Sequence, residues 1–559
     1  MKKKERKEKI NKKDKVMQKS DFMHGAFIAT LGIIITKILG VLYVIPFYAI
    51  IGEKGGALYG YAYTFYLIFM AISTAGIPLA ISKLTAEYQT LGYYDAKKKA
   101  FNIGRTIAIT LGAVCFIILF AFAPDLAHAI LGDLKGGNTI EDVTFVIRVI
   151  STAIIIVPVL SIYRGYFEGH KYITPTAISQ VLEQVVRVCI IVIGSYMVLK
   201  VFNGGLTNAV GIAVFAATAG SLASYFYLIF KKKKNNYLFE EREKKVKEPN
   251  ITTKEILKKI FIYAFPLIMI DIFKSLYSLV DTVTVVKALS PIYGTHDAES
   301  IMSILSTWAA KFNMIIISIS TGMTVSLTPN LTTSLVLKDY DDIRSKINES
   351  LKVLAILVIP MTAGLSFLAE PVYTLFYGAS KYGASVFSFF IYVSLITAFF
   401  TTTITITQVL KKYKTVFISL FSGIVLKAIL NVPLINLFNS IGIHAYYGSI
   451  VSSIIGYGLS FIICLISLSK SYKVSYKDSF IEILKIIFAT IVMILALTLL
   501  KFIIPISSTT RIVNLTIIIV YTLTGIIVYY LVVKKTGTLY RVFGKEFLTK
   551  IKKKLRLSK

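Results

Sequence analysis

The chain has 559 residues, of which 55% are hydrophobic and 16% are charged, and its mean hydropathy is +0.70. This composition excludes an ordinary soluble globular protein. A net charge of +32 alone would suggest a nucleic-acid partner, but the lysines and arginines gather in short polar segments between apolar runs. Basic segments placed in this way orient membrane helices and contact anionic phospholipids, so no nucleic-acid partner is predicted.

Apolar segments recur along the chain, and each is long enough to cross a bilayer, which takes about 20 apolar residues. The fourteen predicted spans are residues 25–47, 58–81, 104–124, 142–163, 173–199, 207–230, 259–284, 300–328, 350–369, 383–408, 415–438, 443–469, 480–504 and 511–533. The basic segments 1–24 and 534–559 are predicted tails, and segment 231–258 is a predicted linker. We therefore predict an all-α polytopic membrane protein with about fourteen transmembrane helices.

Two further patterns organise these spans. If the N-terminus is cytoplasmic, most of the 62 lysines and arginines fall in the two tails and the cytoplasmic connections, which predicts that both termini are cytoplasmic. An internal repeat relates Ile72–Thr74 in the second span to Ile319–Thr321 in the eighth, since both are Ile-Ser-Thr followed by a polar turn and a charged helix. The repeat predicts two six-helix lobes, residues 25–230 and 259–470, with segment 471–533 outside it.

Charged residues inside a membrane are costly and usually face a bundle interior or a cavity, so they are the candidate site residues. The candidates for substrate binding are Lys37, Lys311, Lys427, Arg187, Glu183, Arg148, Lys274 and Asp271. Glu183 and Arg187 can pair on one helix face, as can Asp271 and Lys274, and for these four a structural ion pair and a role in binding or gating stay open.

The remaining cations differ in their surroundings. Arg148 lies about two turns from the outer end of its span, where an interfacial position is expected. Lys37, Lys311 and Lys427 have no acid within four residues on their own helices, so we expect them to meet an anionic cargo. The chain has no Walker A, GxSxG or HExxH motif and no Cys/His cluster with metal-ligand spacing. It is therefore predicted to be a transporter and not an enzyme, driven by an ion gradient, the membrane potential or substrate flux.

Three segments carry a resemblance to a known family. The stretches MHGAFIATLGIIITKILGVLYVIPFYAIIG, ISTAGIPLAISKLTAEY and SIYRGYFEGHKYITPTAISQVLEQVVRV resemble the MurJ-type lipid II flippases of Gram-positive bacteria. The last is shared with SpoVB-like polysaccharide exporters, and all belong to the multidrug/oligosaccharidyl-lipid/polysaccharide superfamily. The resemblance implies a multi-pass protein of the bacterial plasma membrane that works as a monomer.

The resemblance also implies a mechanism. Two six-helix lobes surround a central cavity, two C-terminal helices form a hydrophobic groove, and alternating access carries an undecaprenyl-diphosphate-linked precursor, lipid II, to the outer leaflet. Lys37, within Thr36–Gly40, matches a cavity cation of the family, and Lys311 lies within one residue of another. Two other family cations would fall near Tyr43 and Ala71, so Arg187 or Lys427 is expected to replace them.

The resemblance implies no cofactor beyond an ion used for coupling. The Na⁺ site of some family members would draw on Asp281 and Asn431.

Alternative functions remain open at this point. The cargo of the same mechanism could be a teichoic-acid, capsule or spore-envelope precursor, which the sequence does not separate from lipid II. A cation-coupled multidrug exporter would need acids in the cavity, whereas the first span offers Lys37 and no acid. A non-transporting scaffold is disfavoured, because it has no use for costly charges in the middle of the membrane.

Overall fold

The computed structural model describes residue 32 and residues 35–235, 249–506 and 510–544. The predicted tail 1–24, much of the predicted linker and most of the tail 534–559 lie outside the described residues. The described part contains helices joined by short turns and no strand. It divides into two compact units, Met1–Leu279 and Val280–Lys559, with the division inside one long helix, α11 (Thr253–Tyr293).

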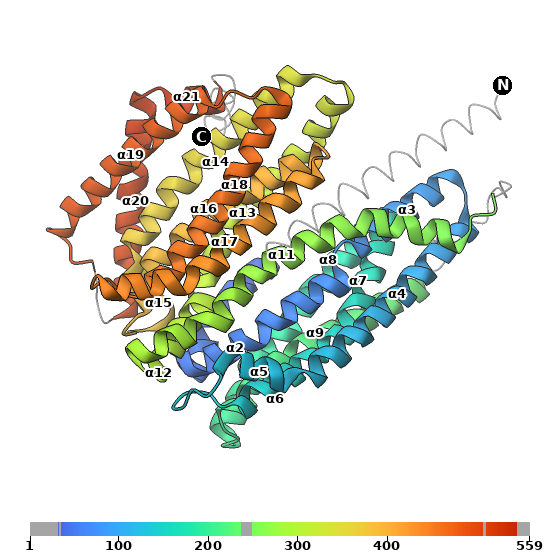
Figure 1. Cartoon of the computed structure of the whole chain (residues 1–559), viewed down its shortest axis with the longest axis horizontal. Coiled ribbons are helices and arrows are strands. Elements are labelled where there is room, and N and C mark those ends of the chain that lie inside the picture. Colours follow the sequence, from blue (N-terminus) through green and yellow to red (C-terminus); the bar gives the residue numbers. More distant parts are fainter. Residues whose placement is uncertain (1–31, 33–34, 236–248, 507–509, 545–559) are drawn as a thin grey trace, which may run out of the picture. The chain divides into compact units, whose positions relative to one another are not determined.

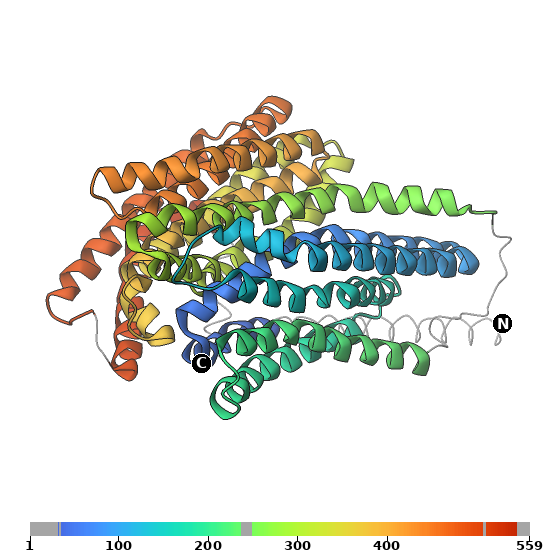
Figure 2. The same ribbon diagram turned by 60° about the horizontal axis from the view of Figure 1, so that its bottom comes forward.

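The first unit is a bundle of long helices that run side by side (Figures 1 and 2). Besides the first part of α11, its helices are α2 (Val44–Thr74), α3 (Ile77–Leu91), α4 (Tyr94–Ala121), α5 (Ala123–Leu131), α6 (Ile140–Ser151), α7 (Ala153–Gly169), α8 (Ile173–Cys189), the π-helical turns η1 (Ile190–Gly194) and η2 (Met197–Val201), and α9 (Leu206–Lys234).

The second unit has the same kind of construction. It contains the rest of α11, then α12 (Thr295–Ser303), the π-helical turn η3 (Ile304–Trp308), α13 (Ala309–Val336), α14 (Tyr340–Phe367), α15 (Ala369–Tyr377), α16 (Gly383–Val409), α17 (Tyr413–Ser440), α18 (Tyr447–Tyr472), α19 (Lys477–Lys501), α20 (Arg511–Lys535) and α21 (Thr538–Phe543). In η3 the N–H of Ala309 donates to the carbonyl of Ile304, five residues back, and the hydroxyl of Tyr377 donates to the carbonyl of Trp308 at 3.1 Å.

Twelve stretches of the described residues are long and apolar enough to cross a membrane. One of them, Ile35–Leu91, covers residues 35–47 of the first predicted span and all of the second, and eleven others match one predicted span each. The seventh predicted span, 259–284, lies in α11, which is not among the twelve. Every predicted span thus has a helical counterpart, and the chain is an all-α polytopic membrane protein.

Two glycines divide the first of these stretches. Gly52 interrupts α2 with φ 62° and ψ −163°, which separates the first two predicted spans. Gly76, with φ 75°, separates α2 from α3, and Pro78 follows at the start of α3, where its missing N–H costs nothing. This glycine and proline end one helix and begin another, so the predicted span over 58–81 contains a break near its end.

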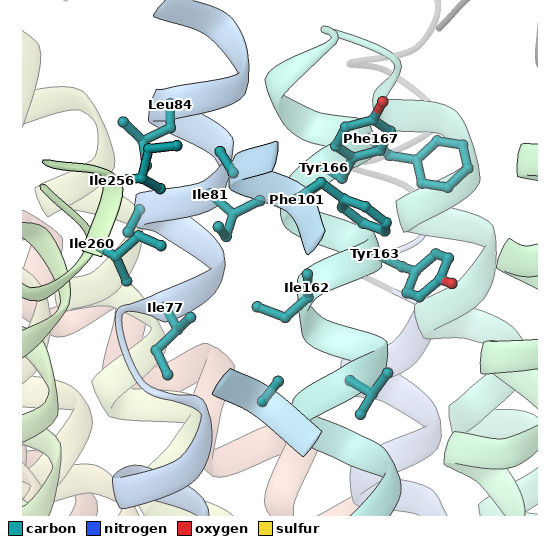
Figure 3. Close-up of a cluster of buried hydrophobic side chains, with 14 of the residues drawn as sticks. Ile77, Ile81, Leu84, Phe101, Ile162, Tyr163, Tyr166, Phe167, Ile256 and Ile260 are labelled. Carbon is teal, nitrogen blue, oxygen red and sulfur yellow. The ribbon is translucent and has the colours of Figure 1, made fainter. Parts of the chain in front are cut away.

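Close packing in the first unit depends on small residues. A Cβ atom on Gly165 of α7 would lie 2.3 Å from the carbonyl oxygen of Pro78, and one on Gly169 would lie 2.6 Å from that of Ser82. Around this contact, α3, α4, α7 and α11 bury a cluster of apolar side chains that includes Ile81, Phe101 and Phe167 (Figure 3). Helices in a bilayer associate through such close approach, because lipid is as apolar as their side chains.

In the second unit, small residues line one face of α18 at every fourth position. These are Gly448, Ser452, Gly456, Ser460 and Cys464. At Gly448 a Cβ atom would lie 2.4 Å from the backbone nitrogen of Ile435, so α17 and α18 are almost in backbone contact. By contrast, α19 and α20 keep rows of apolar side chains exposed, such as Phe488 at 57% and Leu523 at 55%. These rows suit contact with lipid.

Candidate substrate-binding site

Three charged residues of the first unit form one cluster, here called the Arg164–Glu183–Arg187 triad. Arg164 Nη2 lies 2.8 Å from Glu183 Oε2, and Arg187 Nη2 lies 2.5 Å from Glu183 Oε1. The side chains are 14–24% exposed. Because two guanidinium groups share one carboxylate, the triad carries one positive charge in excess.

The helices around the triad hold it in place. Arg164, on α7, also donates from Nε to the hydroxyl of Ser179 at 3.0 Å, while Ser224 of α9 donates to the carbonyl of Ser179 at 2.5 Å. Gly220 lets α9 approach α8 closely, since a Cβ atom there would lie 2.7 Å from the carbonyl oxygen of Glu183. The triad is therefore fixed by helix packing and not only by charge.

Arg187 keeps an unused donor. Its Nε is buried, and no hydrogen-bond partner for it occurs in the part of the chain that the structure describes. A buried donor without a partner carries a desolvation penalty of about 1–3 kcal/mol. Arg187 thus combines excess charge with a donor able to bind an acceptor atom.

Lys37 belongs to the helical residues 35–42 and has an exposed side chain. Its helix packs on α8 through glycines, because a Cβ atom on Gly40 would lie 3.6 Å from Nε2 of Gln184 and one on Gly32 would lie 3.5 Å from Cβ of Ala177. Among the described residues, Lys37 makes no hydrogen bond or ion pair. The structure therefore places this cation on the helix that lies against α8, which carries Glu183 and Arg187.

The other predicted residues of the first unit have local contacts. Arg148 donates from Nε to the backbone carbonyl of Phe120 at 3.4 Å, and its guanidinium lies 5.1 Å from the centroid of the Phe120 ring. Asp271 and Lys274 form the ion pair expected from their spacing, at 3.8 Å, with side chains 52% and 40% exposed. An exposed pair of this kind is a weak contributor to stability.

In the second unit, Lys427 of α17 is buried, with its side chain 2% exposed, and its Nζ lies 2.5 Å from Asp281 Oδ2 of α11. Asn431, one turn after Lys427, donates to Asp281 Oδ1 at 3.3 Å and to Thr284 Oγ1 at 2.7 Å, and it accepts from Ser452 Oγ of α18 at 2.6 Å. The structure thus joins one predicted anion ligand, Lys427, to both predicted metal ligands, Asp281 and Asn431.

This arrangement does not fit a sodium ion. Hard cations bind oxygen ligands, yet Oδ2 of Asp281 is taken by the ammonium of Lys427 and Oδ1 receives the amide of Asn431. The carbonyl oxygen of Asn431 accepts from Ser452. In the described residues no group of three or more His, Cys, Asp or Glu side chains could hold a metal. A positive charge at this site is already supplied by the chain.

Lys311 lies in the first turn of α13, directly after η3, and is partly buried. Arg164, Thr284 and Ser452 are site residues that sequence reasoning missed. Arg164 was excluded because its span was predicted to end at Tyr163, whereas α7 continues to Gly169. The sequence Tyr-Arg-Gly directly after an apolar run was the signal that could have placed Arg164 in the fourth predicted span. Thr284 and Ser452 carried no signal.

The comparisons with known proteins agree with this picture. A family model described as polysaccharide biosynthesis protein matches residues 22–333. Lipid II flippase MurJ of Bacillus subtilis (strain 168) is 35% identical over 466 residues, which cover 82% of this chain and 84% of that protein.

Two solved structures show the same fold. A lipid II flippase MurJ in an inward closed conformation has a TM-score of 0.61 at 18% identity, covering 92% of this chain and 99% of its own. An inward-facing MATE family multidrug resistance transporter of the MOP superfamily has a TM-score of 0.59 at 13% identity, covering 82% and 98%. The resemblance found in the sequence is confirmed: the chain belongs to the polysaccharide biosynthesis protein family, as a relative of the MurJ lipid II flippase.

Proposed function

We propose that the chain is a flippase that moves lipid II from the inner to the outer leaflet of the bacterial plasma membrane by alternating access. The observation that carries the proposal is the excess positive charge of the Arg164–Glu183–Arg187 triad, next to the helix that bears Lys37. A diphosphate is the anionic part of such a cargo, and guanidinium groups bind phosphate oxygens in a bidentate manner.

The cost of these charges supports the proposal. A lysine or arginine at the centre of a membrane helix costs at least about 2.5–3.5 kcal/mol on insertion scales, so such cations are retained where they have a use. Lys37 and Lys311 are the further cations proposed to contact the diphosphate. Arg148, Lys274 and Asp271 are assigned to the local contacts described above, and Lys427 to its pair with Asp281.

The sign of the charge favours this cargo over a cationic drug. A MATE family multidrug transporter shares the fold, so the fold alone does not choose between them. An exporter of cationic drugs needs uncompensated acids, whereas in the triad the single carboxylate is shared by two arginines. The curated relative is named for transport and not for catalysis, in agreement with the prediction that the chain is not an enzyme.

The finer parts of the proposal follow the sequence predictions. Residues 25–230 and 259–470 form two lobes, with 471–533 as two additional helices. Both termini are cytoplasmic, basic segments contact anionic phospholipids, and the protein acts as a monomer. A teichoic-acid, capsule or spore-envelope precursor carries the same kind of anionic lipid-linked head group and is the second candidate cargo.

The test is genetic rescue in a bacterium depleted of its own lipid II flippase. We expect the chain to restore growth and the appearance of lipid II in the outer leaflet. A matched control is Arg148→Ala, which removes a cation that already has local contacts and should still rescue. Failure to rescue by wild-type protein that reaches the membrane contradicts the lipid II proposal, and rescue of a strain blocked in another lipid-linked polymer would identify the second candidate.

Topology is tested with an impermeant thiol reagent. Cysteines placed at Gly136 and Asn203 should react in intact cells, and a cysteine at Asn236 should react only after lysis. Labelling of position 236 in intact cells contradicts the proposed orientation of the termini.

A further inference from the structure

The second unit contains a cation site built from three helices. Asp281 and Thr284 lie one turn apart on α11, Lys427 and Asn431 lie one turn apart on α17, and Ser452 completes the group from α18. The ammonium contacts the carboxylate, and the amide of Asn431 joins that carboxylate to the two hydroxyls. The carboxylate, the amide and the hydroxyls carry oxygen atoms of the kind that bind hard cations.

We propose that Lys427 is a resident cation that fills a latent sodium site, so that the second unit is ordered without Na⁺ and gains a Na⁺ site when this ammonium is removed. The proposal concerns the stability of this unit and does not rest on the proposed transport activity.

Charge balance is the first argument. A carboxylate held away from water is very costly unless it is paired, and the Asp281 side chain is only 20% exposed. The ammonium supplies the compensating charge at 2.5 Å from Oδ2. Because the ammonium is part of the chain, it occupies this position at every salt concentration. A free cation would have to approach the same oxygen against the repulsion of the lysine.

The surroundings of the pair are the second argument. Lys427 is almost completely buried, so truncating it to alanine leaves space beside Asp281 within the packed helices. Thr284 Oγ1 then still faces the site. The side-chain amide of Asn431 can rotate by half a turn and present its oxygen to the site, because the oxygen and nitrogen of an amide have nearly the same size and position. The exposed part of Asp281 gives a small ion a route to the carboxylate.

The experiment measures thermal unfolding of the full-length protein in detergent, in NaCl and in choline chloride of equal ionic strength. For the wild type we expect the same Tm in both salts. For Lys427→Ala we expect a lower Tm in choline chloride and a saturable rise with NaCl, of about 2 °C at one hundred times the dissociation constant. Binding of ²²Na⁺ at about one ion per Lys427→Ala molecule, and none to the wild type, is the second readout.

Two control variants isolate the site. Lys311→Ala removes the same side chain from another helix of the unit and should show no Na⁺-specific rise. The double variant Asp281→Asn with Lys427→Ala removes the carboxylate as well and should lose the Na⁺ response.

Several outcomes overturn the inference. A Na⁺-specific rise in the Tm of the wild type shows that Lys427 does not fill the site. An equal Tm of Lys427→Ala in both salts, or a Na⁺ response that survives in the double variant, shows that no latent site exists there. If Lys427→Ala folds in neither salt while the neutral variant Asp281→Asn with Lys427→Gln folds, Na⁺ cannot replace the ammonium and the inference fails.

Discussion

The two charged clusters in the membrane-spanning part differ in charge balance and in hydrogen bonding, and these differences decide their roles. The Arg164–Glu183–Arg187 triad has two cations for one anion and retains a buried donor on Arg187. The pair of Asp281 and Lys427 is electrically balanced, and the side chain of Asn431 is hydrogen-bonded at both its nitrogen and its oxygen. Excess positive charge and a donor without a partner suit the binding of an anionic ligand. Balanced charges and fully hydrogen-bonded side chains instead hold helices together.

This contrast teaches that an intramembrane lysine has no fixed meaning. Lys37 and Lys427 look alike in the sequence, since each lies in an apolar span without an acid on its own helix. One is exposed and the other is buried against an acid from a helix 146 residues away. Variants of the two should therefore fail in different assays, and the predictions below test this.

The largest expected effect on transport is that of Lys37→Ala. Loss of the ammonium removes a charge that meets the diphosphate, so we expect lipid II flipping to fall by a factor of at least about 100, equivalent to about 2.7 kcal/mol. Flipping is measured by the appearance of lipid II in the outer leaflet of flippase-depleted cells. Lys37→Arg should be milder because the charge survives. Wild-type flipping by Lys37→Ala would remove the distinction between the two clusters.

The next effect is on stability, in Asp281→Asn. This change leaves the buried ammonium of Lys427 without its counter-charge, which costs about 3–5 kcal/mol for a buried pair. The free energy of unfolding of the purified protein should fall by this order. The matched variant Asp271→Asn breaks the exposed pair with Lys274 and should change stability by less than about 1 kcal/mol. Equal losses in the two variants would contradict the assignment of a structural role to Asp281.

A smaller effect tests whether Arg187 of the triad acts in transport or only in holding the helices together. Arg187→Lys keeps the positive charge but loses the planar fork that holds Glu183 and presents Nε. We expect flipping to fall by about tenfold, or 1.4 kcal/mol, with unfolding nearly unchanged. Unfolding that falls as much as flipping would make Arg187 a structural residue, like Lys427.

The last effect depends on pH and concerns the turn between α7 and α8. Burial lowers the pKa of His170 to about 4, below the value of about 6.5 in the unfolded chain. Its contribution to stability is therefore complete above pH 6.5 and is lost as the pH falls toward 4, by up to about 1.4 kcal/mol per pH unit. The Tm of the wild type should fall over this range more steeply than that of His170→Gln. Identical slopes would show that His170 does not titrate in this way.

Hydropathy and basic residues predicted the helices well because both follow directly from the cost of placing polar groups in lipid. The interruptions within helices were harder to predict from the sequence. Gly76 and Pro78 were the residues that indicated the end of α2. Ion pairs within a helix, such as Glu183 with Arg187, could be predicted from spacing. The pair of Asp281 and Lys427 could not, since it depends on which faces of α11 and α17 meet.

The π-helical turn η3 has a consequence for insertions and deletions. Such a turn holds one residue more than the α-helical turn it replaces, and here the hydroxyl of Tyr377 supports the carbonyl of Trp308 at its end. Deleting one residue within 304–308 would restore an ordinary α-helix, while deleting one after Lys311 would rotate the rest of α13 by about 100°. The surplus residue therefore aligns the preceding helix α12 with the face that carries Lys311, so chain length as well as residue identity specifies where this cation points.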